Sequence, residues 1–227
     1  MRQRLSLAVA FALVFTGAWS PEPSAAVRPP KLQYELMTLP NGLTVILSED
    51  HSTPIVHLQL WYHVGSKNEK PGRTGFAHLF EHLMFKGSRN VEPEGHTSLV
   101  SSVGGQANAY TEDDVTVFWE TVPSQYLPLI LWLEADRMAT LRIDQESFAN
   151  EREVVKEERR MRVDNQPYGR LSEIIYDQAF STHPYKHTTI GSMQDLAAAS
   201  VDDVRNFYNT FYVPENATLT LVGDFDP

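Results

Sequence analysis

The sequence predicts an α+β domain of about 200 residues, and three observations support this fold class. Segments with the pattern of strands come in clusters, and amphipathic helical segments are grouped between these clusters rather than alternating with single strands. Hydrophobic residues make up 42% of the chain and charged residues 21%, a mixture that can bury a core. The sequence contains no internal repeat or low-complexity segment, so residues 27–227 are assigned to one domain.

Four segments have the composition of strands. The turn signal Pro40-Asn41-Gly42 precedes the first, at residues 43–47. Residues 55–64 are rich in β-branched and aromatic side chains and form the second. A third is expected within residues 108–121, where apolar and polar residues alternate. Residues 217–222 form the fourth.

Apolar residues recur at helical spacing in five segments: 75–85, 125–138, 145–163, 171–180 and 201–212. The third of these segments is highly charged and has only a narrow apolar stripe. The fifth is preceded by Ser200, which with Asp203 has the spacing of a capping box.

Charge and cysteine content exclude several classes of function. The chain has 19 basic and 29 acidic residues, a net charge of −10, so no nucleic-acid partner is expected because a phosphate backbone would be repelled. The absence of cysteine excludes thiol nucleophiles, iron–sulfur clusters and cysteine-based zinc sites. Any metal site must therefore use histidine and carboxylate ligands.

The N-terminus has the pattern of an export signal. Two arginines precede an apolar stretch at residues 5–19, which is shorter than the roughly 20 residues of a membrane-spanning helix. Small residues follow at 24–26, where a signal peptidase would cut. We therefore predict a signal peptide at residues 1–26, a mature chain without a transmembrane segment, and a periplasmic or secreted location. An uncleaved signal anchor is the alternative.

The most informative motif lies in the first predicted helix. His78 and His82 are four residues apart, so both imidazoles lie on one face and can share one metal ion. Glu81 borders the same face. This is the H-x-x-E-H arrangement, the inverse of the commoner H-E-x-x-H. Its apolar neighbours indicate a packed helix, in which ionisable groups are costly unless they are paired or bound to metal.

A third ligand is needed, and the charged helix at 145–163 is the best source. Glu151 and Glu158 are two helical turns apart and are expected to share a face with Val154 and Val155. Carboxylates on an inward face need a cation. The other acids of this run are expected to form solvent-exposed pairs with basic neighbours: Glu153 and Glu157.

Together these segments resemble, in order, the N-terminal domain of the pitrilysin family, which includes insulin-degrading enzyme and mitochondrial processing peptidase. The resemblance rests on Gly65-Ser66, residues 75–87, Gly104-Gly105, residues 108–111, Glu151-Arg152 with Val155 and Glu158, and residues 222–225. It implies one half of the clamshell metallopeptidase fold, with a mostly antiparallel sheet and helices packed on one face.

The resemblance also implies roles for individual residues. By this similarity, one Zn²⁺ per chain is held by His78, His82 and Glu158, Glu81 is the catalytic carboxylate, and Glu151 supports a ligand. Elementary chemistry agrees, because three such ligands leave a fourth zinc position for a water whose pKa falls toward ~7. Glu81, offset round the helix from the histidines, is placed to accept a proton from that water.

Substrate contacts are inferred from one short segment. By resemblance, Asn108, Ala109 and Tyr110 belong to a sheet edge to which an extended peptide adds through main-chain hydrogen bonds. An ordinary strand whose side chains only pack is the alternative. The other six histidines are expected to be surface or packing residues: His51, His57, His63, His96, His183 and His187.

Members of this family consist of two similar halves, and the resemblance covers the first half only. Three arrangements therefore remain open: part of a longer protein, a subunit that docks a separate C-terminal half of similar fold, or self-association. We expect a zinc-dependent endopeptidase domain acting on peptides or unfolded segments. A non-catalytic, chaperone-like subunit of the same fold is the alternative, and a lyase with the same motif is set aside because it needs a cysteine.

Overall fold

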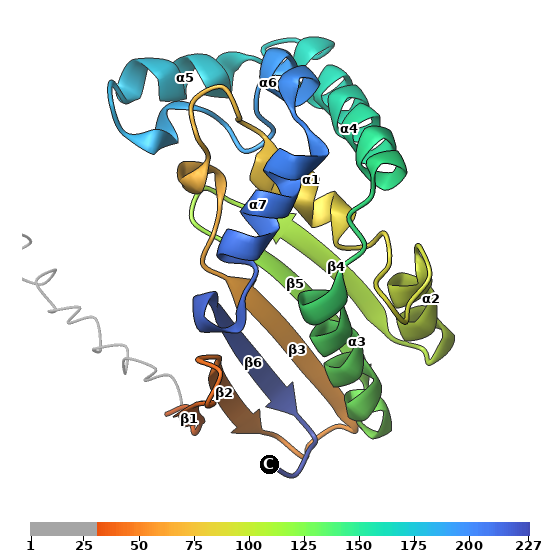
Figure 1. Ribbon diagram of the computed structural model, residues 1–227. Coiled ribbons are helices and arrows are strands. Elements are labelled where there is room, and N and C mark those ends of the chain that lie inside the picture. Colours follow the sequence, from red (N-terminus) through yellow and green to blue (C-terminus); the bar gives the residue numbers. More distant parts are fainter. Residues whose placement is uncertain (1–30) are drawn as a thin grey trace, which may run out of the picture. The chain divides into compact units, whose positions relative to one another are not determined.

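The computed structural model describes residues 31–227, so the predicted signal peptide lies outside the described residues. Six strands form one sheet in the order β1-β2-β6-β3-β5-β4 (Figure 1). Neighbouring strands are antiparallel, apart from β2 and β6, which are parallel. The strands are β1 (Glu35–Thr38), β2 (Thr44–Glu49), β3 (Ile55–Tyr62), β4 (Gln106–Thr111), β5 (Thr116–Pro123) and β6 (Ala217–Gly223).

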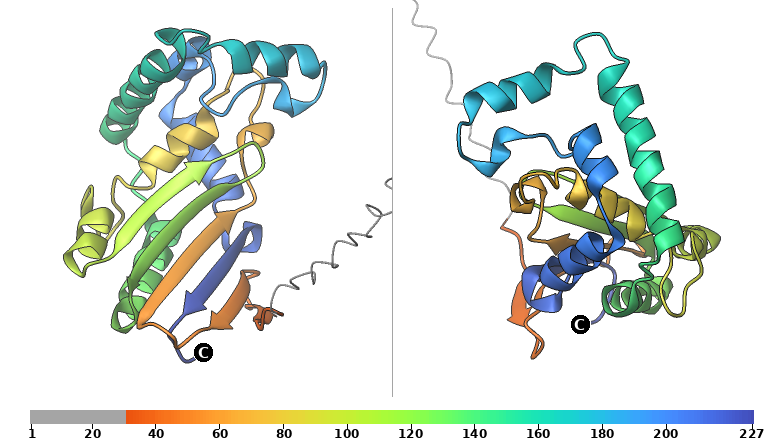
Figure 2. Two further views of the ribbon diagram at one scale, coloured as in Figure 1. Left: turned by 180° about the vertical axis from the view of Figure 1, so that it is seen from behind. Right: turned by 45° about the horizontal axis from the view of Figure 1, so that its top comes forward.

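Helices lie on one face of this sheet, as predicted. In Figure 1, α3 and α7 cross the face turned to the viewer, whereas the view from behind in Figure 2 shows the strands uncovered. No helix in residues 31–227 is long and apolar enough to cross a membrane. The helices are α1 (Phe76–Leu83), α2 (Gly95–Ser102), α3 (Leu127–Thr140), α4 (Gln145–Arg159), α5 (Leu171–Ala179), α6 (Met193–Ala198) and α7 (Val201–Phe211).

The core lies between the sheet and α1, α3 and α7. Alternate residues of β3 point into it, as the two-residue period of a strand requires: Val56, Leu58, Leu60 and Tyr62. Helix α1 contributes Phe76, Leu79, Phe80 and Leu83, all of which are buried. Burial of this apolar stripe fixes α1 in the core and leaves its polar face, which carries the H-x-x-E-H motif, at the edge of the core.

Some predicted boundaries are wrong. The expected strand within residues 108–121 is two strands, because the backbone turns between Thr111 and Thr116, where Glu112 N donates to the carbonyl of Val115 at 2.8 Å. Strand β1 and helices α2 and α6 were not expected. Strand β1 is exposed along its whole length and α6 has only 6 residues, so neither shows a hydrophobic period. The capping box of Ser200 and Asp203 at the start of α7 is confirmed.

The aromatic core beneath α1 yields a stability prediction. Phe80 is 1% exposed and packs against Tyr212 and Tyr208, with ring centroids 4.2 and 5.6 Å apart. Truncation in Phe80→Ala leaves a cavity, so we expect it to lower the free energy of unfolding by about 3–5 kcal/mol in urea titrations. Ile174→Ala, at a position 55% exposed on α5, is the control. A loss below about 1 kcal/mol for Phe80→Ala would contradict this account of the core.

Candidate metal centre

The start of helix α1 is capped by a side chain from outside the helix. Gly75, its N-cap, has φ +90° and no side chain to cap the helix. The carboxylate of Glu69 does this instead, accepting hydrogen bonds from Gly75 N at 2.9 Å and Ala77 N at 2.8 Å. Burial raises the pKa of Glu69 to about 8, against the lowering effect of these backbone donors. The first turn of α1, directly before His78, is therefore held from outside the helix.

The structure brings the two histidines of α1 together with one carboxylate of α4. The rings of His78 and His82 have centroids 4.9 Å apart. Nε2 of each ring lies 3.3 Å from the same atom, Oε2 of Glu158. Two ligands bonded to a tetrahedral zinc at about 2.0–2.1 Å stand about 3.3–3.4 Å apart. Both separations from Glu158 therefore fit ligands of one zinc ion.

Helix α4 presents two of its four central acids to α1. Its start is fixed by Asp144, whose side chain accepts from Ser147 N. Glu151 is buried and Glu158 half-buried on the side facing α1, whereas the other two are exposed and pair with Lys156 and Arg160, as predicted: Glu153 and Glu157. The expectation for Val154 is wrong. It is 47% exposed, because one step along a helix turns the side chain by about 100° from the buried Val155.

Glu81 lies beside the three converging atoms without joining them. Its Oε2 is 3.5 Å from Nδ1 of His78 and accepts a hydrogen bond of 2.6 Å from the hydroxyl of Thr111, at the end of β4. The carboxylate is thus oriented by the edge strand. Glu81 therefore lies next to the site but is not one of the three converging groups.

Glu151 contacts the other ring from its outer side. Its Oε2 is 3.4 Å from Nδ1 of His82, and its Oε1 is 3.0 Å from Nζ of Lys86. Burial raises the pKa of Glu151, but His82 and Lys86 together lower it by more. The pKa of this carboxyl is therefore held below its usual range. An ionised carboxylate at Nδ1 fixes the ring with Nε2 turned toward Glu158.

His78 and Glu158 shift each other's pKa through their contact. The hydrogen bond with His78 lowers the pKa of Glu158 to about 2, against the raising effect of burial. Burial lowers the pKa of His78, but its contacts with Glu158 and Glu81 raise it more, to about 9. In the metal-free protein a proton on His78 therefore neutralises part of the acidic cluster that a divalent ion would otherwise neutralise.

Three residues of this site were not predicted. Thr111 orients Glu81, Lys86 pairs with Glu151, and Arg162 contacts Oε1 of Glu158 at 2.6 Å. Two of them had a signal in the sequence, because Lys86 is four residues after His82 and Arg162 four after Glu158, the spacing of neighbours on a helix. The role of Thr111 depends on how β4 meets α1, which no local pattern reveals.

The cleft above these groups has a volume of about 570 Å³ and also includes Asn108, Ala109 and Tyr110. These three residues belong to β4, which is one of the two edge strands of the sheet and pairs with β5. Ala109 packs toward the core, whereas the ring of Tyr110 meets Trp61 edge to face with centroids 6.4 Å apart. The predicted substrate segment and the histidines thus border the same space.

A second group of acids and a histidine, elsewhere in residues 31–227, has a different character. His96, Glu120 and Glu134 are buried together, but Arg137 lies among them and forms ion pairs with both glutamates. Burial lowers the pKa of His96 to about 3, so this ring stays neutral. A guanidinium already balances the carboxylates, which makes this cluster a structural ion network. The expectation for His96 was a surface or packing role, and the ring is buried.

Comparison with known proteins places this chain in a family. Residues 44–193 match the model of the insulinase family, peptidase family M16, and residues 198–227 match that of the peptidase M16 inactive domain. The chain therefore belongs to peptidase family M16, which confirms the resemblance to pitrilysin and its relatives.

Relatives of this chain carry the names of zinc proteases. It is 37% identical over 193 residues to zinc protease PqqE of Helicobacter pylori, covering 85% of this chain and 44% of that protein. It is 31% identical over 208 residues to an uncharacterized zinc protease of Mycobacterium tuberculosis strain H37Rv, covering 90% of this chain and 45% of that protein. The chain thus spans less than half the length of these relatives.

Solved structures share the fold. A protease from Helicobacter pylori superposes with a TM-score of 0.84 at 36% identity, covering 86% of this chain and 47% of that one. The periplasmic protease PqqL from Escherichia coli gives 0.77 at 26% identity, covering 88% of this chain and 23% of that one. The predicted half-clamshell fold is confirmed by these neighbours.

Removing a ligand should remove the metal. We expect about one zinc per purified chain by elemental analysis, and its loss in His78→Ala and in Glu158→Gln, because two remaining ligands cannot hold zinc tightly. Glu157→Gln is the matched control, since that acid is next in sequence but exposed and paired with Arg160. Zinc content unchanged by both ligand substitutions would contradict the assignment.

Zinc binding should release a proton. His78 has a pKa of about 9 in the metal-free protein, so it is protonated at pH 7, whereas a zinc ligand must be neutral. We expect His78 to release about one proton per zinc at pH 7, a contribution that falls as the pH rises through 9 and that adds to any proton lost by a zinc-bound water. Titration calorimetry in buffers of different ionisation enthalpy measures this release. A binding enthalpy independent of buffer at pH 7 would contradict it.

Proposed function

We propose that this chain is the zinc-dependent endopeptidase domain of an exported protease that hydrolyses peptides or unfolded segments. The observation that carries this proposal is the convergence of Nε2 of His78 and His82 on Oε2 of Glu158, each at 3.3 Å, with a further carboxylate alongside. Membership of peptidase family M16 and the names of its relatives support it.

His78, His82 and Glu158 would hold one Zn²⁺ per chain. When bound, such an ion activates water at neutral pH and polarises a carbonyl. Glu151 would keep the ring of His82 in the required orientation through Nδ1, 3.4 Å away. The role of Lys86, 3.0 Å from Glu151, is then to keep that carboxylate ionised and in place.

Glu81 would act as general base and later as general acid. Its Oε2 is fixed by the hydroxyl of Thr111, so the carboxylate is already oriented before substrate arrives. It can take a proton from the attacking water and pass it to the departing amine. General acid–base catalysis of this kind raises the rate by about 10²–10⁴-fold.

The substrate would bind as an added strand. Asn108, Ala109 and Tyr110 lie on the edge strand β4, whose outer backbone groups can pair with an extended peptide. Binding through the main chain gives little side-chain specificity, which suits unfolded segments. We further propose that a second half of similar fold, in the same polypeptide or as a partner subunit, completes the chamber, since the relatives are about twice as long.

The location proposed is the periplasm or the outside of the cell. The predicted signal peptide and the likeness to a periplasmic protease, PqqL of Escherichia coli, support export.

Replacing the base should separate catalysis from metal binding. In protein that contains both halves, we expect Glu81→Gln to lower kcat for peptide cleavage by about 10²–10⁴-fold, because the amide cannot accept the proton. Zinc content should stay near one per chain, since Glu81 is not placed as a ligand. Glu153→Gln, at an exposed acid that pairs with Lys156 and does not line the cleft, is the control. Cleavage retained by Glu81→Gln would refute its role, and no cleavage by wild-type protein would favour the chaperone-like alternative.

A further inference from the structure

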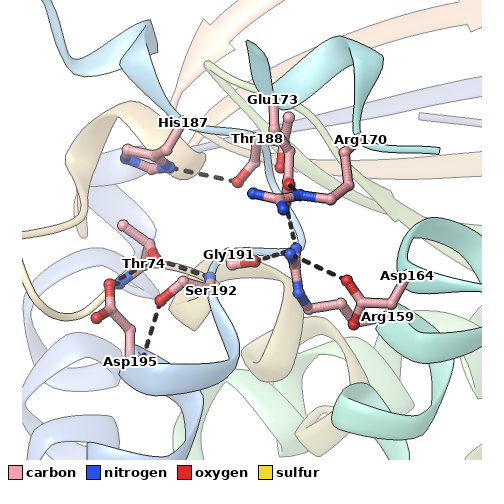
Figure 3. Close-up of polar contacts among 10 residues, drawn as sticks. All are labelled: Thr74, Arg159, Asp164, Arg170, Glu173, His187, Thr188, Gly191, Ser192 and Asp195. Atoms are coloured by element: carbon pink, nitrogen blue, oxygen red, sulfur yellow. Dashed lines mark hydrogen bonds and ion pairs between the residues drawn. The ribbon is translucent and has the colours of Figure 1, made fainter. Parts of the chain in front are cut away.

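A segment distant from the metal ligands touches both helices that carry them. Residues 187–195, here called the tie segment, lie between α5 and α6 and include the first turn of α6 (Figures 1 and 3). One part of it contacts the residue before the N-cap of α1, and another contacts the last residue of α4. The ligands His78 and Glu158 lie within one turn of these two contacts.

The contact with α1 is made through Thr74. Its backbone N and its hydroxyl both donate to Oδ2 of Asp195, at 3.0 and 2.6 Å, as Figure 3 shows. The same hydroxyl accepts from Ser192 N at 3.0 Å. Three hydrogen bonds therefore hold the chain four residues before His78, at the point where α1 begins.

The contact with α4 is made through Arg159, which directly follows Glu158. Its side chain is almost fully buried, and Nη1 donates to the carbonyl of Gly191 at 2.7 Å and to the carboxylate of Glu173 (Figure 3). Nη2 is 3.5 Å from Asp164. A buried guanidinium shared among these acceptors fixes the end of α4, because leaving it unpaired would be costly.

Gly191 accepts from Arg159 and also lies very close to the backbone at the start of α1. A Cβ at this position would lie 2.3 Å from the backbone N of Gly75 and 2.4 Å from the carbonyl carbon of Thr74. The residue also has φ +68°, which favours glycine. The carbonyl that accepts from Arg159 thus belongs to a residue in direct backbone contact with the start of α1.

We propose that the tie segment sets the spacing between the ligands of the two helices, with Thr74, Arg159 and Asp195 as positioning residues. The inference rests on the proposed metal site. Zinc ligands must hold their distances to within about 0.2 Å, so a small slide of α4 along α1 would weaken the site before it unfolds the domain. The tie connects the two helices close to the ligands themselves.

The first test removes one hydroxyl. Thr74→Val keeps the shape of the side chain but loses the bonds to Asp195 and Ser192 that Oγ1 makes, and we expect zinc affinity, measured by chelator competition, to fall at least about tenfold. Thr74→Ser retains the hydroxyl and should restore the wild-type value. Thr210→Val is the matched control, because Thr210 is exposed and its hydroxyl donates only to the carbonyl of Asn206 within α7.

The second test removes the buried positive charge at the end of α4. We expect Arg159→Met to weaken zinc by a similar factor and to change the visible spectrum of the cobalt(II)-substituted protein, which reports ligand geometry. Arg160→Met, the next residue but exposed and paired with Glu157, should change neither. Circular dichroism and thermal melting of the metal-free variants separate this effect from loss of fold.

The outcomes are distinct. Thr74→Val and Arg159→Met that are folded and bind zinc and cobalt as wild type does would overturn the tie, while the metal site would stand. Variants that lose stability but keep wild-type affinity and cobalt spectrum would likewise overturn it. Wild-type chain that binds no zinc would refute the metal centre, and the positioning role with it.

Discussion

The site depends on one geometric requirement: three donor atoms from two helices, far apart in sequence, must stand about one ligand–ligand distance from each other. Each helix meets the requirement in its own way. Helix α1 is held by its apolar stripe in the core, so the backbone that carries His78 and His82 has a fixed position. Helix α4 is more polar and is held by few buried groups, so its ion pairs matter more for the position of Glu158. Repulsion among the carboxylates around this point is relieved by a proton on His78 or by a divalent ion, which makes metal binding and local charge balance one equilibrium.

The ends of these helices show how the surrounding chain supports the site. A carboxylate buried beneath the start of α1 would be costly on its own, yet Glu69 is paired there with the backbone donors that a helix start leaves unsatisfied. Glycine at position 75 permits the left-handed backbone of this N-cap, because its φ is +90°. At the far end of α4, a buried arginine takes the carbonyl of Gly191 as acceptor. Two of the buried charged groups, Glu69 and Arg159, thus lie where the ligand-bearing helices begin or end.

The sequence predicted what local periodicity controls and missed what tertiary packing controls. The spacing of His78 and His82 requires a shared helical face, and the two-turn spacing of Glu151 and Glu158 correctly places both near it. Val154 was placed on the wrong side because the narrow apolar stripe of α4 gives few positions from which to fix its phase. The prediction of one strand within residues 108–121 overlooks a turn signal, because aspartates favour turns and Asp113-Asp114 lie between β4 and β5. Contacts between elements, such as that of Thr111 with Glu81, leave no trace in any single segment.

The hydrogen bond between Thr111 and Glu81 links the candidate metal site to the sheet. Thr111 ends β4, the strand on which Asn108, Ala109 and Tyr110 also lie, and its hydroxyl fixes one oxygen of Glu81. A peptide added to the outer edge of β4 would take its register from the backbone of that strand, because the side-chain period of two permits no intermediate alignment. The same strand would therefore set both where a scissile bond lies and where the base points. Registration through one rigid strand would remove the need for side-chain pockets that align a substrate with the proposed base, which suits the proposed action on many unfolded sequences.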